Sequence, residues 1–408
     1  MSDKPSCSTS FWHLSILYIN VFFYALFYQM QAPLLPFISK ELGGDSSSFS
    51  SMQSYFSIVQ LLGGIASGPF GDTFGSKLIL TISNLSSSLS YFLTASASTM
   101  STLNLSRLPT LFQHGMLGTR GMVALLVPSG KRAVFLGYIM LAYGCGMAVG
   151  PALGGVLASS WDVRASAWIA SLGALVGAVV VGLCLPSLSG GENKKGSYRP
   201  DAERHGFSTR IYRVLSFPRV RRLLLIKLFM DTSSRILYST LPFILVQDPA
   251  FSADSQDLGY LLSYSGIVVS LSQALLIGPI TNRLEDREII LSCLAFISLS
   301  FLGLSQAYSM AHIWIVFIPL LVFGTLFSTI NTAQLSKSVS LKDVGTVLSL
   351  DMSIGSFVGI FSSQLGIYIF EGYGFEYFGI ACSICTTMAT LLCILTYRQY
   401  PQTTSKTN

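Results

Sequence analysis

The chain has 408 residues, of which 51% are hydrophobic and 11% are charged, with a formal net charge of +6 and a mean hydropathy of +0.58. Soluble domains usually carry about 25% charged residues, so this composition excludes an ordinary soluble globule. The basic excess does not indicate nucleic-acid binding either, because the aromatic residues stand in apolar stretches rather than among the charges.

Apolar stretches of about 20 residues recur along the chain, each long enough to cross a hydrocarbon layer as a helix. The first stretch is too long for a cleavable secretory signal and lacks a cleavage site, so we expect it to act as a signal anchor. The predicted fold class is an all-α integral membrane protein with twelve transmembrane helices. These helices are expected near 11–38, 48–70, 78–98, 102–127, 133–159, 164–186, 222–246, 257–281, 288–308, 311–335, 343–369 and 375–397.

Basic residues gather on alternate connections between these stretches, and the opposite connections carry mostly acids. The positive-inside rule therefore predicts a multi-pass protein with both termini in the cytosol, in a plasma or internal membrane that the sequence leaves open. The basic set comprises Lys77, Lys131, Arg132, the 187–222 segment, Arg283, Arg287, Lys337, Lys342 and Arg398. The opposite connections carry only Lys40 and Arg164, beside acids such as Asp45, Asp248, Asp254, Asp257, Glu371 and Glu376.

A segment rich in Gly, Ser, Lys and Arg separates six apolar stretches from the other six, and it is expected to be a flexible cytosolic linker. Its end, 211–222, alternates arginine with apolar residues, which suits a short helix at the membrane surface. The two halves look related, because GPFGDTFGSKLIL at 68–80 and GPITNRLEDREII at 278–290 stand 210 residues apart. The expected organisation is a cytosolic N-terminus (1–10), a six-helix bundle (11–186), the linker (187–221), a pseudo-symmetric second bundle (222–397) and a cytosolic C-terminus (398–408).

The fifth apolar stretch carries a pattern of glycines inside an expected helix. Glycines at three- and four-residue intervals form a groove where a neighbouring helix approaches at backbone distance. The proline removes one backbone donor and bends the helix. The functional interpretation is a tight moving contact between transporter helices, and the alternative is ordinary small-residue packing. The pattern consists of Gly137, Gly146, Gly150, Pro151, Gly154 and Gly155.

Ionisable residues inside membrane helices cost about 2.5–3.5 kcal/mol each and are functional candidates. Lys227, Asp231 and Arg235 share one stripe of the seventh helix, so Asp231 can pair with either base. They predict either a site in a cavity where Asp231 takes up and releases a proton, or a structural row of ion pairs in which the charges neutralise one another. Asp351, in the eleventh helix, has no base within a helical turn, and it is expected to be either a proton carrier or an ionised group in the cytosolic vestibule.

The first and fourth helices add uncharged and basic candidates. Gln29, with Gln31 and Asn20, is expected to offer hydrogen bonds to a ligand or to bridge helices. His114 follows Arg107 by seven residues and is expected on nearly the same helical face, either as a proton relay or as a histidine satisfied by a helix carbonyl.

With these patterns the chain resembles the major facilitator superfamily along its whole length. The 68–80 segment resembles the family's loop motif at Gly68, Asp72, Gly75, Lys77 and Leu80, and the glycine pattern resembles the fifth-helix motif associated with antiporters. The resemblance implies a gating role for Asp72, which is expected to face the N-terminal end of the eleventh helix.

The departures from the family pattern come in matched sets. The two motif arginines are Thr73 and Ser76 here, and the acid that pairs with the second arginine in the family is replaced in the Leu126–Val127 region. Losing both partners leaves no unpaired charge. Arg107 resembles the family's fourth-helix arginine, although the glycine expected four residues later is absent.

Four shorter segments resemble one branch of solute carriers within the family: VQLLGG (59–64), SRLP (106–109) with His114, LIK (225–227) and DVGT (343–346). This resemblance implies proton-coupled antiport of lipophilic organic cations, with two halves rocking about a midplane site. An organic anion stays open as substrate, because the intramembrane bases Arg107, Lys227 and Arg235 outnumber the two acids.

A transport-inactive scaffold that binds a cytosolic partner through the linker is a third interpretation. Deleting residues 190–210 discriminates, because only the scaffold loses its function. The sequence shows no zinc spacing, phosphate loop or nucleophile elbow, so we expect no enzyme activity, no cofactor and no metal. The expected partners are a small organic solute, the proton and the lipid bilayer, and the protein is expected to be monomeric.

Overall fold

The structure is a computed structural model that describes residues 7–128, 132–186, 207–339 and 343–399. Within these ranges the side chains of 7–11, 67–74, 124, 133–134, 207–210, 344–345 and 396–399 lie outside the description. Every regular element in the described ranges is a helix, as the fold class predicted.

The chain divides into two compact units, each described by itself below. Unit 1 holds the described residues of 1–198 and 242–270, and unit 2 those of 199–241 and 271–408. Unit 1 contains α1 (Cys7–Met30), α2 (Leu35–Glu41), α3 (Ser46–Phe74), α4 (Ser76–Ala95), α5 (Met100–Leu105), η1 (Leu108–Phe112), α6 (Gly115–Leu126), α7 (Arg132–Ser160), α8 (Ala165–Cys184) and nearly all of α12 (Ser255–Leu271). Unit 2 contains α10 (Phe207–Ser216), η3 (Ser272–Leu276), α13 (Ile277–Arg283), α14 (Asp286–Ser305), α15 (Met310–Lys337), α16 (Val344–Tyr373) and α17 (Phe375–Gln399). Helix α11 (Pro218–Gln247) belongs to unit 2 as far as Leu241, and the division falls at its internal Pro242.

Nine helices of the described ranges are long and apolar enough to cross a membrane by length and composition. Helix α11 is not among them, because it carries Lys227, Asp231 and Arg235 besides three arginines near its start. The helix with most of the candidate charges is therefore the one whose composition departs furthest from a plain lipid-spanning segment.

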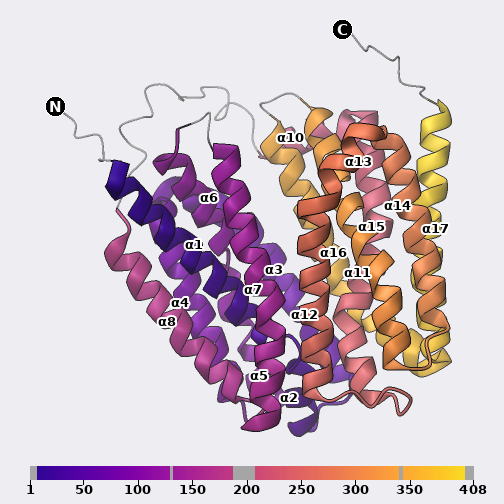
Figure 1. The fold of residues 1–408 in the computed structure, drawn as a ribbon, viewed down its shortest axis with the longest axis horizontal. Helices are drawn as coiled ribbons and strands as arrows, with labels where there is room; N and C mark the ends of the chain where they lie inside the picture. Colours follow the sequence, from indigo (N-terminus) through magenta and orange to yellow (C-terminus); the bar gives the residue numbers. More distant parts are fainter. Residues whose placement is uncertain (1–6, 129–131, 187–206, 340–342, 400–408) are drawn as a thin grey trace. The chain divides into compact units, whose positions relative to one another are not determined.

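Unit 1 is built from two closely packed helix pairs. Helix α1 lies along α7, and α4 lies along α8 (Figure 1). A core of buried aliphatic side chains from α1, α4, α6 and α7 joins these pairs at one end, including Leu17, Leu80, Met122 and Ile139. At the start of α3, the Ser48 side chain and the Ser48 amide, the latter at 2.8 Å, both donate hydrogen bonds to Asp45, and these bonds lower the pKa of the Asp45 carboxyl.

The glycine pattern on α7 brings α1 to backbone distance. A Cβ at Gly146 would lie 2.5 Å from the Phe22 carbonyl oxygen, and one at Gly154 would lie 2.0 Å from the Met30 carbonyl oxygen. Gly150 likewise faces Leu26. These three glycines form the α1 side of the pattern, since no side chain fits there.

Helix α12 packs against a different side of the same pattern. A Cβ at Gly155 would lie 2.4 Å from the Ser255 carbonyl oxygen and 3.2 Å from the Cα of Gly259. Pro151 leaves the Met147 carbonyl without its helical donor, and Gly266 of α12 lies directly against that carbonyl. The pattern therefore serves two neighbouring helices, whereas the sequence indicated a single groove.

Three of the twelve expected helices are interrupted. The stretch 11–38 was expected to be one helix, but α1 ends at Met30 and α2 restarts at Leu35, because the intervening segment contains Pro33 and Pro36 occupies the first turn of α2. The stretch 257–281 contains the π-helical turn η3. The fourth stretch, 102–127, is divided into α5, the 3-10 turn η1 and α6.

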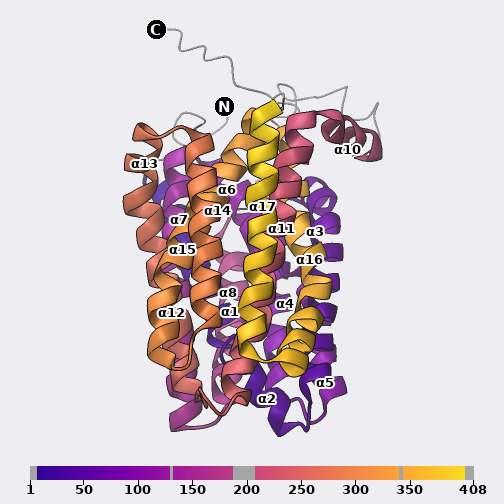
Figure 2. The ribbon, with the colours of Figure 1, turned by 90° about the vertical axis from the view of Figure 1, so that its right-hand side faces the viewer.

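Unit 2 packs α14 against both α15 and α17, and Figure 2 shows α14 beside α17. Helix α10 lies at a large angle to α11 in the same view. Its Val214 is buried in a cluster with Val220 and Leu224 of α11, Leu335 of α15 and Val347 of α16. The short helix expected over 211–222 is divided in the structure, because α10 ends at Ser216 and the rest of that range belongs to α11, which begins at Pro218.

We predict that Gly154→Ala destabilises the protein and that Gly137→Ala does not. The Gly154 Cβ would meet the Met30 backbone, whereas nothing lies within 4 Å of a Cβ at Gly137. Overpacking of this kind costs about 1–3 kcal/mol, and alanine is otherwise favoured over glycine in a helix by about 1 kcal/mol. Thermal unfolding of the purified protein in detergent measures both variants, and equal midpoints would contradict the backbone contact.

Candidate functional site

Three charged side chains of unit 2 meet where α11 and α16 pack together. The Lys227 Nζ lies 3.0 Å from Oδ2 of Asp231, one helical turn along α11, and 3.7 Å from Oδ1 of Asp351 on α16. The sequence left open which base pairs with Asp231, and in the structure this base is Lys227. One lysine thus contacts two carboxylates.

Asp351 is buried, with 6% of its surface exposed. Its Oδ2 accepts a hydrogen bond from Thr332 of α15 at 3.1 Å. Little of Asp351 is thus open to solvent, and its role, either a proton carrier or an ionised group in the cytosolic vestibule, stays a prediction. The sequence shows no base within one turn of α16, and the base comes instead from another helix.

Arg235 lies one turn beyond Asp231 and passes over Gly355 of α16. A Cβ at Gly355 would lie 2.9 Å from Nη2 of Arg235 and 3.5 Å from Oδ2 of Asp231. The absence of a side chain at Gly355 gives the guanidinium its space. Arg235 makes no ion pair with a described carboxylate and is largely exposed, so it is free to turn toward Asp231.

In unit 1 the interrupted fourth segment exposes backbone carbonyls that a continuous helix would satisfy. Pro109 has no N–H and occupies the first turn of η1, which breaks the α-helical pattern after α5. Non-helical backbone at membrane depth persists only where protein groups or water satisfy it. The expected common helical face of Arg107 and His114 is therefore wrong, because no α-helix connects them.

Side chains from three helices supply the missing donors. Ser90 of α4 donates to the Ser106 carbonyl at 2.7 Å, and Gln60 of α3 donates to the Thr110 carbonyl at 3.2 Å. Tyr24 of α1 donates to the Gln113 carbonyl at 3.0 Å. The break is thus a built feature of unit 1, held by donors from α1, α3 and α4.

Arg107 and His114 lie at the two ends of this break. Arg107 is 8% exposed, and its Nε and Nη2 have no hydrogen-bond partner among the described residues. His114 precedes the first residue of α6, and its Nε2 is buried and also lacks a described partner. With Gly63, Ile79 and Leu111, His114 lines an apolar cavity of about 50 Å³.

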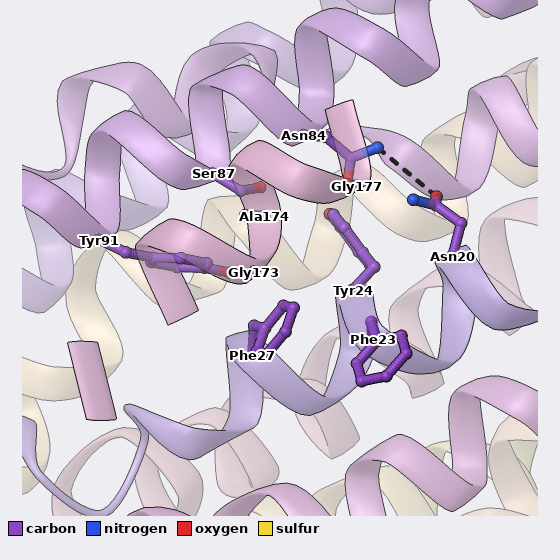
Figure 3. Close-up of a pocket in the computed structure, with 10 residues that line it drawn as sticks. All are labelled: Asn20, Phe23, Tyr24, Phe27, Asn84, Ser87, Tyr91, Gly173, Ala174 and Gly177. Carbon is purple, nitrogen blue, oxygen red and sulfur yellow. Dashed lines mark hydrogen bonds between the residues drawn. The ribbon is translucent and has the colours of Figure 1, made fainter. Parts of the chain in front are cut away.

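A second, smaller cavity of about 10 Å³ lies among α1, α4 and α8. Figure 3 shows Tyr24, Asn84 and Tyr91 around it. Asn84 Nδ2 reaches Oδ1 of Asn20 at 3.5 Å, so Asn20 bridges α1 to α4 as one interpretation expected. Gln29 lies with its Cβ against Gly150, in the α1–α7 contact.

The loop motif is described in part. Gly68 and Asp72 lie in α3, but their side chains are outside the described ones, so the expected contact of Asp72 stays a prediction. Gly75 has φ +85°, a conformation that favours glycine, at the junction with α4. Lys77 lies in the first turn of α4.

Helices α4 and α6 pack closely at Ser76, where the family has the second arginine of its loop motif. A Cβ at Gly121 of α6 would lie 2.1 Å from Oγ of Ser76, and one at Gly118 would lie 2.9 Å from the Leu80 amide. The two helices therefore approach closely at the position of the second motif arginine.

The repeat-related position in unit 2 carries an acid that the sequence reasoning missed. Aligning the Gly-Pro pairs at 68 and 278 places Asp286 at the position of Ser76. Asp286 accepts hydrogen bonds from Gln334 and from Lys337, the latter at 3.1 Å, and Arg219 donates to Gln334. This network ties the starts of α11 and α14 to the end of α15. Aligning the two repeats position by position would have indicated it, whereas nothing in the sequence pointed to Thr332.

Among the described residues no three His, Cys, Asp or Glu side chains form a group that could hold a metal ion. The charged side chains of α11 and α16 instead form ion pairs and a hydrogen bond to α15. Such a site can bind a proton or a charged solute, and its parts lie on helices that also make close glycine contacts.

The model of the Major Facilitator Superfamily matches residues 17–363 and 223–408. The chain belongs to this superfamily. Solute carrier family 67 member A1 of Homo sapiens is 30% identical over 390 residues, covering 92% of this chain and 90% of that protein. Solute carrier family 22 member 18 of Mus musculus is 28% identical over 357 residues, covering 86% and 87%.

Solved structures of the superfamily share the fold. A nucleoside transporter, NupG, aligns with a TM-score of 0.76 at 14% identity, covering 95% of this chain and 99% of its own. The predicted major facilitator fold is thereby confirmed, and the chain is a multi-pass membrane protein of a transporter family.

We predict that Ser90→Ala destabilises unit 1, because it leaves the buried Ser106 carbonyl without its donor. The expected cost is about 1–3 kcal/mol. Ser96→Ala is the matched control, because Ser96 is exposed and bonds the Phe92 carbonyl at 2.8 Å. Thermal unfolding in detergent compares them, and equal loss in both variants would contradict the role of Ser90.

Proposed function

We propose that this protein is a secondary active transporter that exchanges organic cations for protons by alternating access. The single observation that carries this proposal is the contact of one lysine, Lys227, with two carboxylates in unit 2. Membership of the superfamily supports solute transport in general, and the carboxylate pair supports a proton and an organic cation as the exchanged species.

The three contacting groups leave one negative charge uncompensated when both carboxylates are ionised. Lys227 contacts both acids, and Arg235 contacts neither within ion-pair distance. Two carboxylates that share one cation do not both stay ionised at low cost in an apolar setting. One of them therefore takes up either a proton or a cationic solute.

Competition for this one charge couples the two fluxes. A proton on Asp231 or Asp351 lets Lys227 neutralise the other acid, and the cluster then has no free charge for a solute. Loss of the proton restores the charge and favours an organic cation. Thr332 on α15 holds Asp351 in place, and Arg235 on α11 competes for Asp231 when it turns inward.

With this mechanism we propose the membrane topology and the domain organisation that the sequence predicted. Both termini and the 187–221 segment lie in the cytosol, where the basic connections gather. The two bundles, 11–186 and 222–397, are the repeats that move, and Asp72 gates from the loop motif.

Purified protein reconstituted in liposomes with an acidic lumen tests this mechanism. We expect radiolabelled benzyltrimethylammonium to accumulate as protons leave, and a proton ionophore to abolish the accumulation. We predict that Asp231→Asn and Asp351→Asn each reduce proton-driven accumulation by about tenfold or more, since coupling of about 1–3 kcal/mol is lost.

The control is Asp257→Asn, in the first turn of α12, where the carboxylate accepts a bond from the exposed Asp254 amide. This variant should retain wild-type accumulation. Unchanged pH dependence in Asp231→Asn and Asp351→Asn would remove the carboxylate pair from the mechanism.

A further inference from the structure

Unit 1 contains a buried positive charge that no described group balances. Arg107 is 8% exposed and lies at the break in the fourth segment. Its Nε and Nη2 are both buried and without a hydrogen-bond partner among the described residues. A buried charge that is neither paired nor hydrogen-bonded is strongly disfavoured, so this arrangement indicates a missing partner.

The neighbours of Arg107 do not supply that partner. The phenols of Tyr28 and Tyr91 interact with it electrostatically, but they are neutral and cannot balance a charge. The carbonyls of Ser106 and Thr110, beside it in the chain, already accept bonds from Ser90 and Gln60.

The described carboxylates of unit 1 are engaged elsewhere. Glu41 pairs with Arg164 at 3.6 Å, and Asp45 accepts from the Ser48 amide. Asp162, Asp248, Asp254 and Asp257 accept bonds from nearby backbone amides at 2.6–3.2 Å. No described ion pair involves Arg107.

The two unpartnered nitrogens define the shape of the group that fits. Nε–H and Nη2–H lie along one edge of the planar guanidinium and point in the same direction. Two parallel N–H donors match the two oxygens of a carboxylate, which binds in a bidentate manner. A structural arginine would instead spread its donors over carbonyl oxygens, and here those carbonyls are satisfied by α3 and α4.

We propose that Arg107 binds the carboxylate of the transported solute. This inference rests on the proposed function and names its substrate class. The proposed function exchanges a cationic solute, and a solute that also pairs with Arg107 carries a carboxylate as well, so the substrate class is amphoteric. A solute with the cation alone leaves Arg107 unpaired.

A matched set of probes separates the two charges. The amphoteric probe is 4-(trimethylammoniomethyl)benzoate, and its methyl ester retains the cation without the carboxylate. The third probe is 4-neopentylbenzoate, in which carbon replaces the quaternary nitrogen, so that only the carboxylate is charged. Equilibrium binding and proton-driven accumulation of each radiolabelled probe are measured on the full-length protein in detergent and in liposomes.

For the wild-type protein we expect the amphoteric probe to bind and accumulate at least tenfold better than its methyl ester. Arg107→Gln should remove this preference and leave the ester unaffected, and Arg107→Lys should retain only part of it, because lysine keeps the charge without the fork. Arg120→Gln, on the exposed side of α6, is the matched control and should behave as wild type.

Thermal unfolding supplies a readout that a structural role would not reproduce. Arg107→Gln should unfold no earlier than wild type without probe, because no described bond is lost, and it should lose the rise in midpoint that the amphoteric probe gives the wild type. A lower midpoint without probe, together with an unchanged acid-to-ester preference, would overturn the assignment of Arg107.

The outcomes also separate this inference from the proposed function. Equal accumulation of ester and amphoteric probe in wild type and Arg107→Gln overturns the carboxylate site and leaves cation–proton exchange standing. Arg107-dependent binding of the amphoteric probe without any proton-driven flux supports the carboxylate site and overturns the exchange. Arg107-dependent transport of 4-neopentylbenzoate that survives Asp231→Asn supports Arg107 and overturns the cationic half of the substrate class.

Discussion

A polar or charged group inside a hydrocarbon layer must find its partner within the protein, and the structure depends on this constraint. Hydrogen bonding within the helices satisfies nearly all backbone N–H and C=O groups of the described ranges. At the break in the fourth segment it does not, and Ser90, Gln60 and Tyr24 donate to the freed carbonyls from three other helices. The same rule brings Lys227 to Asp231 and Asp351 in unit 2.

Glycine contacts bring several helices to backbone distance. Helix α7 approaches α1 through Gly146, Gly150 and Gly154, and it approaches α12 through Gly155. Such contacts contain no side chain that must repack when a helix shifts by a small distance. In unit 2, Gly355 plays a different part, because its missing side chain leaves room for Arg235 beside the carboxylates.

The two units solve the charge problem in different ways. Unit 2 places a lysine between two carboxylates and ties helix ends together through Asp286, Gln334 and Lys337. Unit 1 has close packing of Gly118 and Gly121 against α4 near Ser76, and its buried Arg107 has two nitrogens without a hydrogen-bond partner among the described residues.

The sequence alone determined the membrane class, the superfamily resemblance, the glycine contacts of α7 and the pairing stripe on α11. These features depend on composition and short spacing, which the chain carries locally. Only the tertiary structure decided that Asp351 meets Lys227, that Thr332 holds it, and that Arg107 and His114 are not on one helical face. Partners on different helices have no fixed spacing, and a break at Pro109 is stable only because distant side chains satisfy it.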